Sequence, residues 1–205
     1  MTENPVELGR QIVVLIGPEG SGKSTMAEKL SVDVGKPHVA TGKIIRELAD
    51  TDECELGEAC RVMFETHSYL PPDLLIKILT RRFEKPDTEN GLILDGGLRT
   101  LEETKEFPDL LEKTHRVMLV SVVYLDIPKE VTMERLLTGK MARRRDDDTE
   151  AAIETRLSHF YLQLEERLDV ISSRPNRRLI KIDATGTAEE VYQKICHELL
   201  KESTQ

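Results

Sequence analysis

The sequence predicts an α/β domain of three layers, in which helices cover both faces of a mostly parallel central sheet. Three observations support this fold class: short apolar, β-branched segments alternate with amphipathic ones, a glycine-rich turn joins the first two segments, and the apolar segment 92–95 ends in an aspartate. Alternation of this kind is typical of parallel strands that are connected by helices. At 205 residues the chain suits one domain, with a substantial core and no need of disulfides.

The first strand and the first helix enclose the glycine turn. Residues 11–16 form an apolar run that is typical of a strand buried on both faces, and residues 26–34 carry apolar side chains at helical spacing. The turn between them, Gly17-Pro18-Glu19-Gly20-Ser21-Gly22-Lys23-Ser24-Thr25, fits the P-loop pattern G-x-x-x-x-G-K-[ST]. The alternative is a glycine turn before a helix that contains Lys-Ser by chance. We disfavour this alternative, because the sequence predicts both the strand and the helix that a P-loop requires. We therefore predict a nucleoside triphosphate site.

The chemistry of the turn suits phosphate. Glycines let successive N–H groups face one concavity, and the helix that follows adds its unsatisfied amides and the positive end of its dipole. Lys23 brings a mobile charge to the outer phosphates, and the Ser24 hydroxyl can reach Mg²⁺. The predicted ATP-binding residues of the turn are Gly17, Glu19, Gly20, Ser21, Gly22, Lys23, Ser24 and Thr25.

The other elements follow from the same periodicities. After a loose tail, residues 1–10, we expect a very short strand at 38–40 and a helix whose N-cap is Thr41. Further helices are predicted over 56–65, 72–82, 101–111, 131–137 and 188–200, with one long helix from Glu150 to Ile171. Residues 86–90 are expected to form a polar loop, and the remaining strands are expected at 92–95, 117–125 and 179–182.

Two polar features extend the predicted site. In an open parallel sheet, ligands lie beyond the carboxyl ends of the strands, so Asp95 should lie beside the P-loop. There, with Ser24, it could hold Mg²⁺ directly or through water. Lys140, Arg143, Arg144 and Arg145 fall within six positions, which suggests an anion as their partner; the alternative is a solvated charged loop.

Composition restricts the setting and the partners. The net charge of −9 argues against nucleic acid as the main partner. Cys54, Cys60 and Cys196 are odd in number and form no C-x-x-C pair, so we expect core or surface thiols rather than a disulfide framework or a zinc site. The chain shows neither a secretory core nor a run long enough to span a membrane. We expect a monomeric cytoplasmic protein that does not bind membranes.

Four segments together resemble adenylate kinases and close nucleoside monophosphate kinases over residues 11–200. The P-loop is the first segment, and His38-Val39-Ala40-Thr41-Gly42-Lys43-Ile44-Ile45-Arg46 is similar to a segment containing S-T-G-D-x-x-R. Asp95-Gly96-Gly97-Leu98-Arg99 is similar to D-G-F-P-R, and Arg145, Asp147-Asp148 and Arg156-Leu157 are similar to R-x-D-D-x-x-E-x-x-x-x-R-L. Leu70-Pro71-Pro72-Asp73 stands where the family has L-V-P-D.

The resemblance implies roles for the matching positions. Thr41, Arg46 and Arg99 would hold the acceptor, with Leu70, Pro71 and Glu103 near its base. Lys23, Arg135, Arg145 and Arg156 would surround the triphosphate, and the catalytic set would be Lys23, Arg99, Arg145 and Arg156. The resemblance also implies one P-loop kinase domain over 1–205, with helical acceptor-binding residues near 41–72 and a short lid at 138–148. Such arginines suit phosphoryl transfer, in which positioning and stabilisation of charge carry the catalysis.

The sequence departs from the family's pattern at four places. Lys43 stands where the family has an acid, Gly97-Leu98 replaces Phe-Pro, Glu103 replaces a glutamine that reads the acceptor base, and Gly139 falls near the position of another lid arginine. These departures leave the P-loop intact. They bear instead on whether the chain has full activity on AMP, although Lys140 or Arg143 could substitute for the lid arginine.

The predicted activity is transfer of the γ-phosphoryl group of ATP to a nucleoside monophosphate, with AMP favoured and two ADP as products. The alternatives are a kinase for GMP, CMP, UMP or another small acceptor, and a nucleotide-binding regulatory protein with weak or no activity. An ionised carboxylate only accepts hydrogen bonds, so Glu103 would match guanine better than adenine and would weaken discrimination for AMP. Alternatively, Glu103 turns to solvent or pairs with Lys105 or Lys43.

Overall fold

The computed structural model describes residues 7–66, 68–138 and 149–201. Its sheet has five strands: β1 (Gln11–Ile16), β2 (His38–Ala40), β3 (Gly91–Asp95), β4 (Leu119–Asp126) and β5 (Arg177–Asp183). Their order across the sheet is β2-β3-β1-β4-β5, and every neighbouring pair is parallel. The predicted parallel sheet is confirmed.

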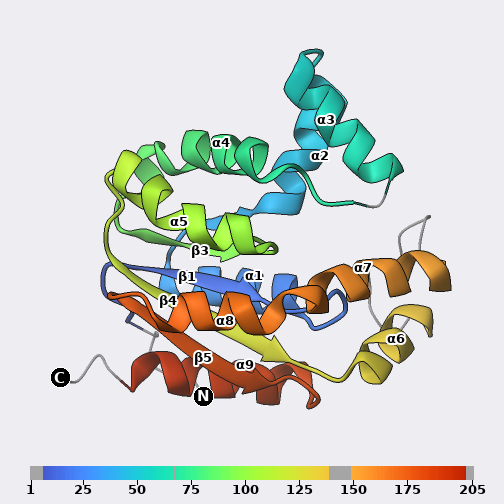
Figure 1. The fold of residues 1–205 in the computed structure, drawn as a ribbon. Helices are drawn as coiled ribbons and strands as arrows, with labels where there is room; N and C mark the ends of the chain where they lie inside the picture. Colours follow the sequence, from blue (N-terminus) through green and yellow to red (C-terminus); the bar gives the residue numbers. More distant parts are fainter. Residues whose placement is uncertain (1–6, 67, 139–148, 202–205) are drawn as a thin grey trace.

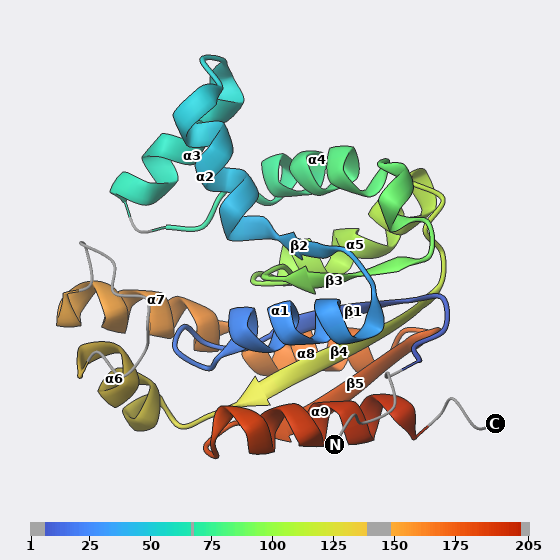
Figure 2. The same cartoon turned by 180° about the vertical axis from the view of Figure 1, so that it is seen from behind.

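Helices form a layer on each side of this sheet. In Figure 2, α1 (Lys23–Val34) and α9 (Ala188–Leu200) lie in front of the strands. In Figure 1, α5 (Leu101–Lys113) and α8 (Leu164–Ser172) lie over the opposite face, with α4 (Pro72–Phe83) packed on α5. The three predicted layers are therefore present.

Alternate side chains of the central strand supply both halves of the core. Val13 and Leu15 pack with α1 and α9, whereas Ile12, Val14 and Ile16 pack with the helices of the other face. This division follows from the two-residue period of a strand. It also explains why the whole segment from Gln11 to Ile16 is apolar after its first residue, since each face of β1 is buried.

Two helix pairs stand beyond the carboxyl ends of the strands. One pair is α2 (Thr41–Thr51) and α3 (Glu55–Glu65), and the other is α6 (Lys129–Leu137) and α7 (Glu150–Leu162) (Figure 1). They surround the edge of the sheet at which β1 continues into the glycine turn. The predicted lid lies between α6 and α7, and residues 139–148 of it fall outside the described residues.

Three predictions of local structure were wrong. The predicted long helix is divided at Gln163, whose φ of −126° and ψ of 24° separate α7 from α8. Thr41 is not the N-cap but the first residue of α2; its buried hydroxyl donates to the carbonyl of Gly96 and accepts no capping hydrogen bond from an amide of its own helix. The polar loop at 86–90 contains a 3₁₀ turn, η1 (Pro86–Thr88).

The three cysteines are free thiols, as the sequence predicted. Cys60 and Cys196 are buried thiols and Cys54 is an exposed one. Among the described helices, none is both long and apolar enough to cross a membrane.

Candidate active site

A cavity of about 660 Å³ opens at the carboxyl edge of the sheet. Its walls come from the P-loop, α2, the end of α3, the loop between β3 and α5, and α7. Among the residues that the structure describes, the Lys and Arg side chains that line it are Lys23, Lys43, Arg46, Arg99 and Arg156. They outnumber the lining carboxylates, which are Glu19, Glu28 and Asp95. A cavity with this balance suits a strongly anionic ligand.

The P-loop forms the floor of one end of the cavity. Gly22 is the N-cap of α1 and has a φ of 92°, a left-handed conformation that favours glycine over other residues. The amino group of Lys23 donates to the carbonyls of Gly17 and Pro18, at 2.7 Å each. The hydroxyl of Ser21 is buried and finds no hydrogen-bond partner among the described residues. The first turn of α1 thus brings unsatisfied amides and a lysine charge to one place.

Asp95 lies next to the P-loop because β1 and β3 are neighbours in register. Its Cα pairs with that of Leu15 on one side and that of Ala40 on the other. Burial would raise the pKa of Asp95, but the nearby polar side chains of His38 and Ser24 and the charge of Lys23 together lower that pKa below its usual value. The imidazole Nε2 of His38 is 3.5 Å from the carboxylate. Asp95 is therefore an ionised oxygen ligand at the cavity wall.

The donor set at this point fits Mg²⁺. A serine hydroxyl and an ionised carboxylate near each other are hard oxygen ligands. No group of three or more His, Cys, Asp or Glu side chains that could hold a metal occurs within the described ranges. Mg²⁺ needs no such protein cage, because it keeps several waters and binds substrate phosphates.

Arg156 connects α7 to the P-loop. Its Nε is 2.6 Å from Oε2 of Glu19, and the arginine side chain is only 11% exposed. A largely buried ion pair of this kind holds its members in one geometry, because separation would leave either charge poorly solvated. The guanidinium is thereby kept beside the glycine turn.

Arg99 enters the cavity from the opposite side. It follows Leu98, which has a left-handed φ of 53°, and its guanidinium lies 5.7 Å from the centroid of the Tyr69 ring. The φ of +80° at Gly96 favours glycine, and a Cβ there would lie 2.7 Å from Nη2 of Arg99. The Arg99 side chain consequently folds back over the backbone at the end of β3.

The remaining predicted acceptor residues divide into two groups. Arg46, on α2, lines the cavity as expected. Thr41 and Leu70 are buried and Pro71 is exposed, and none of these three lines the cavity. Their neighbours Ser68 and Tyr69 do so instead, together with Met63, Phe64 and Phe160. Sequence reasoning missed these five, because apolar and aromatic residues are typical of a core and a lone serine gives no signal of a site.

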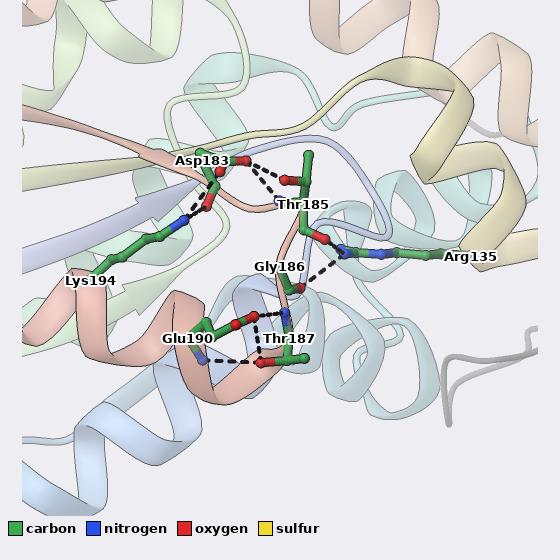
Figure 3. A network of polar contacts seen from close by, with 7 residues as sticks. All are labelled: Arg135, Asp183, Thr185, Gly186, Thr187, Glu190 and Lys194. Carbon is green, nitrogen blue, oxygen red and sulfur yellow. Dashed lines mark hydrogen bonds and ion pairs between the residues drawn. The ribbon is translucent and has the colours of Figure 1, made fainter.

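The predicted triphosphate residues also divide. Arg135 does not line the cavity; its Nη2 donates to the carbonyls of Thr185 and Gly186, at 3.1 and 3.3 Å (Figure 3). Arg145 lies outside the described residues. Of the predicted catalytic set, the structure brings Lys23, Arg99 and Arg156 to one cavity.

The loop that Arg135 contacts is fixed by its own side chains. Asp183 accepts hydrogen bonds from the hydroxyl and the amide of Thr185, at 2.6 and 3.0 Å, and pairs with Lys194 at 3.1 Å (Figure 3). These contacts lower the pKa of Asp183 to about 2, with the Thr185 hydrogen bonds first among them. Thr187 and Glu190 then form a capping box at the start of α9. The carbonyls that receive Arg135 are therefore held in place.

Glu103 has an environment that the sequence did not predict. Its side chain is almost fully buried, does not line the cavity, and accepts a hydrogen bond from the Arg99 amide at 2.7 Å. Burial, the largest influence, raises the pKa of Glu103, against the lowering effects of the Arg99 charge and amide and of Arg167. The carboxyl group faces neither solvent nor Lys43 nor Lys105.

The fold and the cavity together define the class of protein to which this chain belongs. A strand, a glycine turn and a helix that starts with Lys-Ser, beside an acidic strand end and a cationic cavity, make a P-loop nucleotide-binding enzyme. Residues 15–175 match the model of the adenylate kinase family. The chain belongs to the adenylate kinase family, whose members are ATP-dependent phosphotransferases.

Similar proteins cover nearly the whole chain. The adenylate kinase of Mycobacterium leprae (strain Br4923) is 33% identical over 189 residues, which are 92% of this chain and 99% of the relative. That of Nocardia farcinica is 32% identical, over 89% of this chain and 95% of the relative. That of Corynebacterium urealyticum is 31% identical, over 88% and 94%.

The raised pKa of Glu103 predicts a pH dependence of stability. Between the ordinary pKa of 4.5 and the higher folded value, the folded state retains a proton that the unfolded state releases. The free energy of unfolding should therefore fall as pH rises through this range. Glu103→Gln removes the titration, so the variant should gain stability relative to the natural protein as pH rises above 4.5, measured by urea unfolding. Glu106→Gln, at an exposed position of the same helix, is the control; a constant difference for Glu103→Gln would contradict the prediction.

Proposed function

We propose that the protein transfers the γ-phosphoryl group of ATP to AMP and produces two ADP. The observation that carries this proposal is the division of the cations in one cavity. Lys23 and Arg156 lie at the P-loop, and Arg46 and Arg99 reach the cavity from α2 and the loop after β3. Two anionic substrates can approach each other only if each phosphate chain meets its own positive charges. The relatives named adenylate kinase support AMP as the acceptor.

The P-loop end would bind the triphosphate. Backbone amides at the start of α1 would receive the phosphates, and Lys23 would exchange the carbonyls of Gly17 and Pro18 for phosphate oxygens. Arg156, held by Glu19, would stabilise charge on the transferring group. Arg145 of the lid would do the same, and Arg135 would act at the triphosphate from α6. When bound, Mg²⁺ would neutralise phosphate charge, and Ser24 and Asp95 would hold it, directly or through water.

The other end would bind the acceptor. Arginine forks can grip a phosphate with two parallel hydrogen bonds, which suits Arg46 and Arg99 to the monophosphate. Thr41 would act through Gly96, to whose carbonyl it donates, and Leu70 and Pro71 would present backbone groups to the base beside the ring of Tyr69. A short lid at 138–148 would exclude water during transfer.

One chain carries both ends of the proposed site, so we also propose that it acts as a monomer. A reducing, cytoplasmic setting suits its three thiols, of which Cys60 and Cys196 are buried.

One assay separates this proposal from the other acceptors and from a regulatory role. The protein is incubated with ATP, Mg²⁺ and AMP, GMP, CMP or UMP, and formation of the diphosphate is measured. We expect kcat/KM to be highest for AMP, and Lys23→Ala to abolish transfer without unfolding the protein. Preference for another monophosphate would overturn AMP as the acceptor. Absence of transfer to all four would favour the regulatory alternative.

Arg156 provides a second prediction. Arg156→Ala should lower kcat about a hundredfold or more, as loss of an arginine that stabilises the transition state does. Arg178→Ala is the matched control, because Arg178 lies at the start of β5 and donates to the Glu198 carbonyl at 2.7 Å, away from the cavity. The control should retain its kcat. A change confined to the two Michaelis constants of Arg156→Ala would make Arg156 a ground-state binding residue instead.

A further inference from the structure

The peptide group between Leu98 and Arg99 is hydrogen-bonded on both sides to buried, ionisable side chains. Nη1 of Arg167 donates to the Leu98 carbonyl at 2.8 Å, and Oε2 of Glu103 accepts from the Arg99 amide at 2.7 Å. The carbonyl and the amide belong to the same peptide group. Arg167 is 0% exposed and Glu103 is 1% exposed, so solvent competes with neither contact.

This peptide has reason to need support from outside its loop. Leu98 has a left-handed φ of 53°, which disfavours any residue with a side chain, and two glycines precede it. A loop of this composition does not fix its own conformation. The family pattern D-G-F-P-R carries a proline at the position of Leu98, and a proline ring cannot adopt a positive φ. This chain therefore supports Arg99 in another way.

The two gripping side chains come from helices that are anchored in the core. Glu103 lies in the first turn of α5, and Arg167 lies on α8; the two helices pack against each other on one face of the sheet (Figure 1). Arg167 also donates to the carbonyls of Phe160 and Gln163, at 2.5 and 3.3 Å, and lies 4.8 Å from the centroid of the Phe160 ring. Its position is thus fixed independently of the loop.

The chemistry of the pair argues against a purely space-filling role. Burial of an arginine and a glutamate is unfavourable unless their hydrogen bonds are satisfied, and apolar side chains of similar volume would fill the same space without that cost. Each of the two groups shifts the pKa of the other, so they also interact electrostatically. Apolar side chains could not form hydrogen bonds with the peptide carbonyl and the peptide amide.

We propose that Glu103 and Arg167 are positioning residues that fix the Leu98–Arg99 peptide and thereby aim Arg99 at the phosphate of the acceptor. The inference rests on the proposed function in that Arg99 binds this phosphate. It assigns Glu103 a role in holding the acceptor arginine instead of reading the acceptor base.

Kinetics test the proposal through the acceptor. Glu103→Ala and Arg167→Met should each raise the KM for AMP about tenfold or more, as loss of a buried hydrogen bond does, with the KM for ATP changed by less than about twofold. Glu103→Gln retains an oxygen that can accept from the Arg99 amide, so it should remain near the natural values for AMP and for the ratio of AMP to GMP. A merely structural role would lower the active fraction and leave the KM for AMP unchanged.

Arg116→Met is the matched control. Arg116 is also a buried arginine, 8% exposed, and it precedes β4 in the chain. It donates to the hydroxyl of Thr88 and to the carbonyls of Thr114 and Lys85. Its loss should lower the free energy of unfolding and leave the KM for AMP unchanged. Equal rises in KM for Arg116→Met and Glu103→Ala would overturn the proposal.

Hydrogen exchange of the Arg99 amide, followed by NMR, needs no turnover and separates this proposal from the proposed function. Exchange should accelerate about tenfold or more in Glu103→Ala and stay slow in Glu103→Gln. If the natural protein transfers no phosphoryl group, the proposed function fails, and the exchange rates still decide whether Glu103 holds the peptide. Unchanged exchange in Glu103→Ala overturns the proposal. So does an AMP-to-GMP ratio that rises in Glu103→Gln, because Glu103 would then read the base.

Discussion

Repulsion among the cations around one cavity is the constraint on which the rest of this structure depends. Five Lys and Arg side chains of the described ranges line a volume of about 660 Å³, where like charges interact more strongly than in water. The protein balances this charge with groups of its own. Lys23 is held by the carbonyls of Gly17 and Pro18, and Arg156 is held by Glu19. Carbonyls and carboxylates are oxygen ligands, and phosphate oxygens can replace them without rebuilding the cavity.

The parallel sheet is what brings these groups together. Because β1 and β3 are neighbours in register, the glycine turn after Ile16 and the loop after Asp95 leave the sheet side by side. Helices α1 and α5 then start at the same edge, and their first turns carry the groups that fix the two loops: Lys23 for the P-loop and Glu103 for the Arg99 loop. The position of these groups thus follows from the order of the strands, and the flanking helix pairs contribute further walls of the cavity.

Most of the fold could be predicted from the sequence, because it depends on local periodicity and on the glycine turn. Every predicted strand is present, and Asp95 lies beside the P-loop as expected. Long-range contacts account for what could not be predicted. The break at Gln163 carries no glycine or proline, Thr41 donates to Gly96 on a distant segment, and Glu103 turns toward a backbone amide that no pattern marks. Arg167 gave no signal at all, since a lone arginine on a predicted helix is usually solvated.

The central claim is that a single cavity holds both phosphate chains, one at each set of cations. A molecule that joins two adenosines through five phosphates would span both ends, so its inhibition pattern tests this claim most directly. We expect one molecule to bind per chain and inhibition to be competitive against both ATP and AMP. Inhibition that is competitive against only one substrate, or binding of two molecules per chain, would contradict it.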